Sequence, residues 1–228
     1  MKKLTTLIVA ILFTGGMAIA QTNDASIDQV GDDHEATISQ SGTMNTAYVE
    51  QTADAGREGA DVGTATVTQT GAENYANLRQ RSFYGDSEAS IVQLGDRNSV
   101  QGQTDTDDFY QNHGLNILDV VMDGNDNTLY SLAGEAQKNV NTFLLDVIGN
   151  ENKVGTRQHG GYADVVIEGD LNNVTLAQQA SPVDIGNSAY VDIFGSENTV
   201  GISQNGPAHT ANVNVNGDFN TSSITQGN

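Results

Sequence analysis

The chain has 228 residues, with 29 Asp and Glu against 9 Lys and Arg, and contains neither Cys nor Trp. The lack of Cys excludes disulfides, thiolate nucleophiles and Cys-ligated metal sites, and a net charge of −20 disfavours nucleic-acid binding because phosphate groups would be repelled. The sequence holds 23 Asn, 16 Gln and 25 Gly, and its hydrophobic content of 37% is typical neither of a thick globular core nor of plain disorder.

The first twenty residues have the features of a secretory signal peptide. Lys2 and Lys3 precede a short apolar run from Leu7 to Phe13, and Ala18-Ile19-Ala20 supplies an A-x-A end. The apolar run is too short to span a bilayer, and no other stretch approaches about 20 apolar residues. We therefore predict a signal peptide over residues 1–20 and an exported mature chain without a membrane span. Its net charge is −22, because the removed segment carries two Lys and no acid.

The mature chain is built from one short repeat, apolar-x-apolar-x-Gln-x-Gly-x-x-Asn. Copies begin at residues 25, 36, 47, 65, 76, 89, 100, 118, 129, 143, 154, 163, 174, 189, 200, 211 and 222. From residue 36 on, every other step between copies is 11 residues, and the steps between these vary from 9 to 18. This alternation indicates two-strand units. We predict a short N-terminal segment over residues 21–35 with a leading half-unit, and a repeat domain of eight units over residues 36–228.

Each half-unit has the period of a β-strand, since apolar residues occupy every second position. The first inward column of the first strands reads Ala36, Ala65, Ala89, Leu118, Phe143, Ala163, Ala189, Ala211, and the second reads Ile38, Val67, Ile91, Val120, Leu145, Val165, Val191, Val213. Gly follows in all eight units: Gly42, Gly71, Gly95, Gly124, Gly149, Gly169, Gly195, Gly217. Asn follows three residues later: Asn45, Asn74, Asn98, Asn127, Asn152, Asn172, Asn198, Asn220.

These Gly–Asn corners are expected to be tight, because Gly, and next best Asn, adopts the positive φ of a sharp reversal without a Cβ clash. The other connection varies in length and is therefore predicted to be a surface loop. One unit cannot bury its apolar row alone, so units must stack. We predict an all-β fold, a β-solenoid of about eight stacked strand–turn–strand units that form two parallel sheets, plus the leading half-unit. Strands about 4.8 Å apart give a column roughly 40 Å tall.

The third inward position is Gln in ten half-units: Gln29, Gln40, Gln51, Gln69, Gln80, Gln93, Gln158, Gln178, Gln204 and Gln226. Stacked Gln can satisfy one another by hydrogen bonds, as in cross-β structures; the alternative is that these Gln face solvent. In the first strands, Gln gives way to apolar residues from Met122 onward. The second strands Val100-x-Gly102-x-Thr104 and Leu129-x-Ser131-x-Ala133 predict a defect in the ladder beside an acidic loop, residues 105–116. A second long loop is predicted over residues 52–64.

The unit Ala-x-Ile-x-Gln-x-Gly-x-x-Asn-x-Ala-x-Val-x-Gln, as in Ala36 to Gln51 and Ala65 to Gln80, resembles the curlin repeat of bacterial curli subunits. The resemblance covers essentially the whole mature chain. It implies a secreted β-solenoid that polymerises outside the cell into functional amyloid fibres of the biofilm matrix and helps adhesion. It also implies that the ladder residues are the Gln and Asn columns above, and that the partners are a nucleator subunit and a dedicated secretion channel.

Two departures from the family pattern bear on role and export. Only Gln21 to Asp24 precede the first half-unit, whereas the major subunit of the family usually begins with a Gly/Asn-rich export leader, so the export route stays open. Nucleator subunits tend to have a basic or irregular terminal unit. Here no Lys or Arg follows Arg157, and the last unit, Ala211 to Gln226, is regular. This favours a major, fibre-building subunit, with a nucleator as the alternative.

Three other functions compete with the fibre. A β-helix enzyme is disfavoured because His34, His113, His159 and His209 fall in corners or loops without a recurring acidic or Ser partner. Corners such as Gly124-Asn-Asp126-Asn127 offer oxygen ligands for calcium, but the nonapeptide calcium repeat is absent. The third is a monomeric solenoid that presents a flat face, such as an adhesin or an ice binder; regular outward Thr columns would favour ice binding, but the outward residues are mixed. We expect no cofactor and no catalysis.

Overall fold

The computed structural model of the chain describes residues 22–31, 33–53, 62–82, 86–102, 109–112, 116–132, 137–179 and 186–227. The predicted signal peptide, residues 1–20, lies outside the described residues. So do most of the two predicted loops, namely residues 54–61, 105–108 and 113–115.

The described chain is all β, and its strands pair in parallel in two facing sheets. The first sheet contains β1 (Asp24–Val30), β3 (Thr46–Ala53), β5 (Tyr75–Ser82), β7 (Ser99–Gln101) with β8 (Phe109–Asn112), β10 (Thr128–Ser131), β13 (Asn173–Gln179), β15 (Thr199–Asn205) and β17 (Thr221–Gly227). The second contains β2 (Glu35–Thr43), β4 (Gly63–Ala72), β6 (Ser87–Leu94), β9 (Asn116–Asp123), β14 (Asn187–Phe194) and β16 (Thr210–Asn216).

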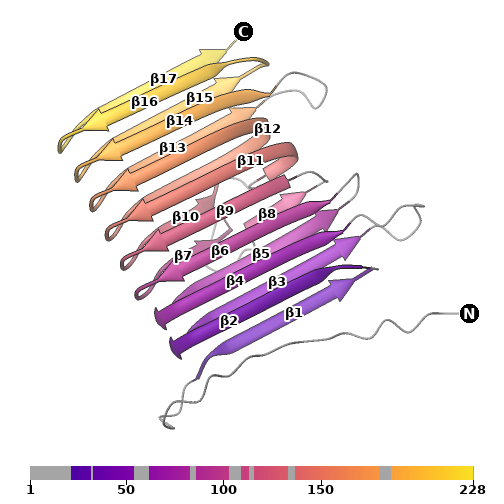
Figure 1. Cartoon of the computed structure of the whole chain (residues 1–228). Coiled ribbons are helices and arrows are strands. Elements are labelled where there is room, and N and C mark those ends of the chain that lie inside the picture. Colours follow the sequence, from indigo (N-terminus) through magenta and orange to yellow (C-terminus); the bar gives the residue numbers. More distant parts are fainter. Residues whose placement is uncertain are drawn as a thin grey trace, which may run out of the picture.

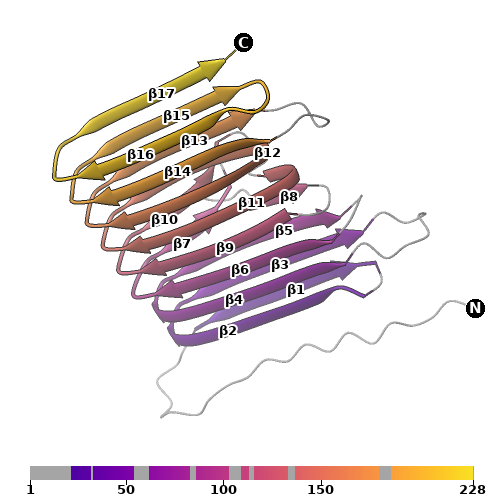
Figure 2. The same cartoon turned by 45° about the horizontal axis from the view of Figure 1, so that its top comes forward.

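Two long strands, β11 (Gln137–Ile148) and β12 (Lys153–Glu168), pass from the first sheet into the second. Residues 153–159 of β12 pair with β13, and residues 161–168 pair with β14. In the described residues the first sheet therefore has nine layers and the second has eight. Figure 1 shows them as one column with β1 at one end and β17 at the other, and Figure 2 shows the two sheets one behind the other. The predicted β-solenoid with two parallel sheets and a leading half-unit is confirmed.

The core is a set of aligned apolar columns between the sheets, one side chain deep from each side. Parallel register places identical or similar residues in adjacent layers, as in Ala65↔Ala89 and Val67↔Ile91. Interior members of these columns are buried, including Val67, Leu78 and Ile193. Ala25, Ile27, Ala36 and Ile224 in the end layers are only partly buried, because no further layer covers them. The apolar rows therefore remain open at both ends of the column.

The middle of the first sheet differs from the sequence prediction. Residues 109–112 are not loop but strand β8, which pairs with β5 and places Phe109 opposite Leu78. β7 and β8 thus lie in the same layer, since both pair with β5. The prediction of one loop from residue 105 to 116 was wrong. Phe109 and Gln111 have the apolar-x-Gln spacing of the repeat strands, but the acidic residues before them suggested a loop.

Candidate assembly site: the polar ladders and the open ends

The inward Gln of the first sheet are joined by hydrogen bonds between layers. Each side-chain Nε2 donates to Oε1 of the Gln in the next layer: Gln29 to Gln51 at 2.7 Å, Gln51 to Gln80 at 2.8 Å, and Gln80 to Gln111 at 2.9 Å. Farther along the column the same bonds link Gln158 to Gln178, Gln178 to Gln204 and Gln204 to Gln226 at 2.7 to 2.8 Å. The interior members are buried. The alternative of solvent-facing Gln is therefore wrong for this sheet.

The predicted defect in the Gln column is also wrong. Gln111 occupies the layer for which the repeat pattern pointed to Thr104, and register places Gln111 opposite Gln80 on one side and Gln137 on the other. Gln137 lies in turn opposite Gln158. The column thus carries Gln in all nine layers, although Thr104 and Ala133 themselves lie outside the described residues. Gln111 and Gln137 could be assigned to it only once the pairing of β8 and β11 was known.

The second sheet has a shorter Gln ladder. Gln40 donates to Gln69, and Gln69 donates to Gln93, at 2.8 Å each. The next layer brings Met122 opposite Gln93, and apolar residues continue the column. Most inward Gln also tie the two sheets together, since their Nε2 donates to a backbone carbonyl of the opposite sheet. Gln40 does so to Asp24 O, and Gln51 does so to Glu35 O.

The Asn side chains of the Gly–Asn corners form a second ladder. In Asn74, for example, Nδ2 donates to Oδ1 of Asn45 in the previous layer at 3.1 Å and to the carbonyl of Gly95 in the next layer at 2.7 Å. Its backbone N–H also donates to Asn45 Oδ1. The same contacts connect the eight predicted members, Asn45, Asn74, Asn98, Asn127, Asn152, Asn172, Asn198 and Asn220. Asn23, absent from the prediction, extends the ladder by accepting from Asn45 N.

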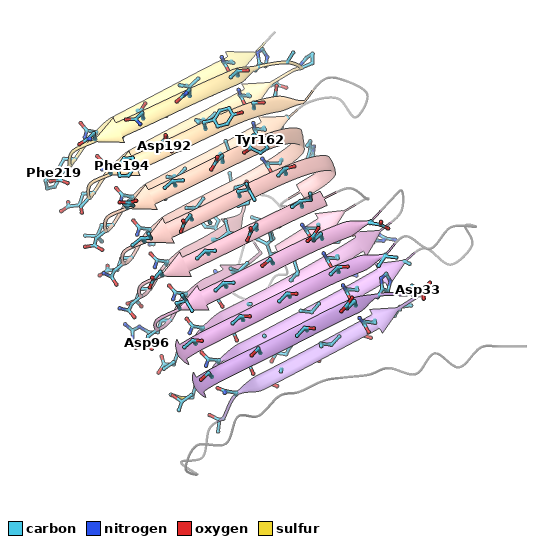
Figure 3. All side chains as sticks on the ribbon, in the orientation of Figure 1. Asp33, Asp96, Tyr162, Asp192, Phe194 and Phe219 are labelled. Carbon is cyan, nitrogen blue, oxygen red and sulfur yellow. The ribbon has the colours of Figure 1, made fainter. Side chains whose placement is uncertain are left out.

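The expectation that these Asn adopt positive φ was wrong. The residue before each Asn is left-handed instead, with φ between 56° and 60°, and its type varies: Met44, Glu73, Arg97, Asp126, Glu151, Leu171, Glu197 and Phe219. Asn is required at its position for the side-chain bonds to two layers. The left-handed residue points its side chain outward, as the labelled Phe219 does in Figure 3, which explains why almost any type is found there.

All eight corner Gly have positive φ, from 102° to 140°. In Gly42, Gly71, Gly95, Gly124, Gly149, Gly169 and Gly195, a Cβ would also meet the carbonyl oxygen of the Gly in the next layer far inside contact distance. Gly217, in the last layer, has only Asn220 Nδ2 at 3.6 Å. Each interior corner therefore requires its Gly for two reasons: the positive φ and the close approach of the next layer.

A third ladder follows the residue after each Gly, and sequence reasoning missed it. A side-chain oxygen in one layer accepts the backbone N–H of the layer before: Asp96 from Ala72, Asn125 from Asp96, Asn150 from Asn125, and Asp170 from Asn150, at 2.7 to 2.9 Å. Asp218 accepts from Ser196. The signal was present, because this position is Asp, Asn or Ser in six of the eight corners. Its short side chains suit a backbone partner one layer away.

Charged and titratable groups lie mainly on the outside of the column. Arg97 Nε and Nη2 donate to the Asp126 carboxylate at 2.6 and 2.7 Å across two corners, and this contact lowers the pKa of Asp126. Tyr48 donates to Asp24 at 2.9 Å, which raises the pKa of the Tyr48 hydroxyl. His34 and His209 lie in the connections before β2 and β16, His159 lies in β12, and His113 falls outside the described residues. Within the described ranges no three His, Asp or Glu are grouped for a metal ion.

The ends of the column present unfilled hydrogen-bond positions. Gln226 Nε2 donates to Thr210 O, but within the described residues it has no Gln of a following layer. Asn220 Nδ2 reaches Asn198 but has no following Gly carbonyl, unlike the interior Asn. At the opposite end Gln29 and Gln40 donate onward into the column, and no Gln of a preceding layer donates to them. One end thus offers donors, and the other offers the matching acceptors.

We expect Gln178→Leu to destabilise the monomer far more than Gln226→Leu. Gln178 is buried and joins Gln158 to Gln204, so its loss leaves a buried donor and a buried acceptor unpaired, at about 1–3 kcal/mol each. Gln226 has one Gln neighbour and partial exposure, so a cost below about 1 kcal/mol is expected. Urea unfolding followed by circular dichroism measures both, and equal losses would contradict a cooperative buried ladder.

Comparison with known families gives one match. Residues 22–52, which span β1, β2 and most of β3, match the model of the curlin associated repeat. Neither the curated proteins nor the solved structures yield a match. No helix among the described residues is long and apolar enough to cross a membrane.

Proposed function

We propose that this chain, whose residues 22–52 match the curlin associated repeat, is a secreted structural subunit that assembles end to end into curli-like extracellular fibres. The observation that carries the proposal is the pair of open ends. Within the described residues no further strand pairs with β1 and β2 at one end or with β16 and β17 at the other, and exposed edges pair with further strands. The column ends in donors at β17 and begins with acceptors at β1 and β2. A contact between unlike ends does not close on itself, so it grows a filament.

We infer a structural rather than a catalytic role. The inward Gln and the corner Asn of this column hydrogen-bond between its own layers, so these side chains stabilise the stack instead of holding a substrate. The fibre would serve the biofilm matrix and adhesion at the bacterial surface, after export guided by residues 1–20. A nucleator subunit and a secretion channel are the partners expected for such a protein.

A major, fibre-building role is proposed over that of a nucleator. The last layer, β16 and β17, keeps the register of the layers before it, as in Val191↔Val213 and Gln204↔Gln226. No Lys or Arg follows Arg157, so the terminal layers carry no basic patch that would set them apart. Regular ends suit a subunit that both accepts and supplies layers along a growing fibre.

Incubation of the purified chain over residues 21–228 tests the proposal. We expect thioflavin fluorescence to rise after a lag, preformed fibres to remove the lag, and negative-stain microscopy to show unbranched filaments. The matched control is Ile224→Lys, which places a charge in the partly buried end row of β17 and should slow growth at least tenfold. A chain that stays monomeric at high concentration, in salt and with seeds would overturn the fibre and favour a monomeric adhesin.

A further inference from the structure

We propose that successive subunits in the fibre are related by a half-turn about the fibre axis, so that each sheet of one subunit continues as the other sheet of the next. This inference rests on the proposed fibre and adds the geometry of its junction. In the described residues, β1 and β17 both lie in the first sheet, which has nine layers against eight in the second. The two ends of the column are therefore not related by a simple translation.

Stacking without rotation would place β1 of the next subunit on β17. In the second sheet, β16 and β2 of the next subunit would then lie two layers apart, about 9.6 Å, with no strand between them. Backbone groups of both edges and the apolar rows ending at Val213 and Ile38 would face this gap. Buried unpaired backbone groups are costly, so the junction would be weak.

A half-turn removes the gap. It places β1 of the next subunit on β16 and β2 of the next subunit on β17, and the strands remain parallel because rotation about the axis exchanges the two sheets and their directions together. The next layer of each sheet is then filled. The columns also agree: Ala25 follows Ala211, Ile27 follows Val213, Ile38 follows Ile224, and Gln40 follows Gln226. The open donor of Gln226 meets the open acceptor of Gln40. Gln29 follows Val215, a Gln–apolar step that Gln93 and Met122 already make inside the column.

The two sides of a layer make equivalent Gln contacts at the first end of the column, which is the end that a half-turn would present to either sheet. Gln40 of the second sheet donates to the carbonyl 16 residues before it in the first sheet, and Gln51 of the first sheet donates to the carbonyl 16 residues before it in the second. At the other end, Gln204 and Gln226 of the first sheet both repeat the contact that Gln51 makes, each donating to the carbonyl 16 residues before it in the second sheet. Across the junction, the same contact leads from Gln29 of the next subunit to Thr221 O.

The connections from the first sheet to the second give a second, independent observation. The half-turn stacks the first of them, residues 31–34, directly on the last Gly–Asn corner, residues 217–220. Gly31 has a φ of 130° and Asp33 a φ of 62°, and Gly217 and Phe219 have 113° and 60°. Only one other described connection on this side, with Gly206 at 105° and Ala208 at 59°, has this conformation, and it precedes the final layer. Corner-like connections thus occur next to the two ends.

His34 takes the place of Asn in the first connection, and the structure contains a precedent for how it would join the ladder. His209 stands at the same position of the connection at residues 206–209, and its backbone N–H donates to Asn187 Oδ1 of the layer below at 3.0 Å. At the junction, His34 N of the next subunit would donate to Asn220 Oδ1. Asn220 Nδ2 would donate to Gly31 O, as Asn198 Nδ2 does to Gly217 O.

Engineered disulfides distinguish the two junctions, since the chain has no Cys of its own. Outward-facing Thr225 of β17 lies opposite Ser39 of the next subunit after a half-turn, and opposite Asp28 without rotation. Directly opposed positions are about 4.8 Å apart, within disulfide range. We compare T225C/S39C with its matched control T225C/D28C. The two Cys of each variant lie at opposite ends of one column, so neither variant can form the disulfide within a monomer.

Fibres of each variant, grown under reducing conditions and then mildly oxidised, are analysed on non-reducing gels after dissolution. The half-turn predicts covalent oligomers for T225C/S39C at ten times or more the yield for T225C/D28C. The reverse ratio, or fibres with oligomers in neither variant, overturns the half-turn and leaves the fibre standing. Failure of the unmodified chain and both variants to form filaments instead overturns the fibre itself. Single-Cys variants T225C, S39C and D28C report random cross-linking.

Discussion

Gly149→Ala is expected to destabilise the solenoid by more than about 3 kcal/mol, or to prevent folding. Gly149 has a φ of 137°, which L-residues with a side chain rarely adopt, and an added Cβ would overlap the carbonyl oxygen of Gly169 in the next layer. That oxygen is the acceptor for Asn152 Nδ2 at 2.7 Å, so the layers cannot separate without breaking the Asn ladder. Urea unfolding monitored by circular dichroism gives the difference in unfolding free energy.

Gly201→Ala is the matched control for this substitution. Gly201 lies within β15 without positive φ, and its added Cβ would have only Ser223 Oγ at 3.9 Å. Because Ala costs less conformational entropy than Gly in a strand, we expect a change between zero and a stabilisation of about 1 kcal/mol. Similar losses for both variants would show that the corner has no special requirement for Gly. A two-state transition in each variant is the condition for comparing the two free energies.

Assembly is expected to accelerate at least tenfold between about 10 mM and 500 mM salt, with a further increase as pH falls from 7 toward 4. The mature chain carries a net charge of −22, and 29 acidic side chains spread over one column oppose the approach of a second copy. Salt screens this repulsion, and protonation of carboxylates removes it. Thioflavin time courses at fixed protein concentration, with seeding to separate growth from initiation, measure both effects.

The sign of the pH effect follows from the acids, because the mature chain has 29 Asp and Glu against four His. Among the acids, Asp126 stays ionised to lower pH than an ordinary Asp, because Arg97 lowers its pKa. Slower growth in high salt would show that attraction between unlike charges, rather than the stacking of similar layers, joins the subunits.

Most of the fold could be predicted from the repeat columns, because a parallel stack places the same residue type in each layer. The alternation of Ala36, Ile38 and Gln40 predicted the inward face of β2. The invariant spacing of Gly42 and Asn45 predicted where the chain turns. Both predictions depend only on local spacing, and stacking the layers does not change it. The ladder after the corner Gly was accessible in the same way, from the run of Asp, Asn and Ser at that position.

Tertiary pairing decided what spacing could not express. Gln111 and Gln137 complete the Gln column only because β8 pairs with β5 and β11 pairs with β8, and a sequence pattern does not say in which layer a strand pairs. The left-handed residue at each corner could not be predicted from the sequence either, since Met44, Arg97 and Phe219 share a backbone conformation but no side-chain chemistry.

The regular spacing of Asn, Gln and Gly along the sequence was sufficient to predict a stacked repeat, because such columns satisfy one another only when layers lie in register. It could not predict how the stack begins and ends. That depends on which sheet holds the first and last strands and on the backbone shape of the connections beside them. Both follow from the three-dimensional path of the chain, and they determine how one copy can meet the next.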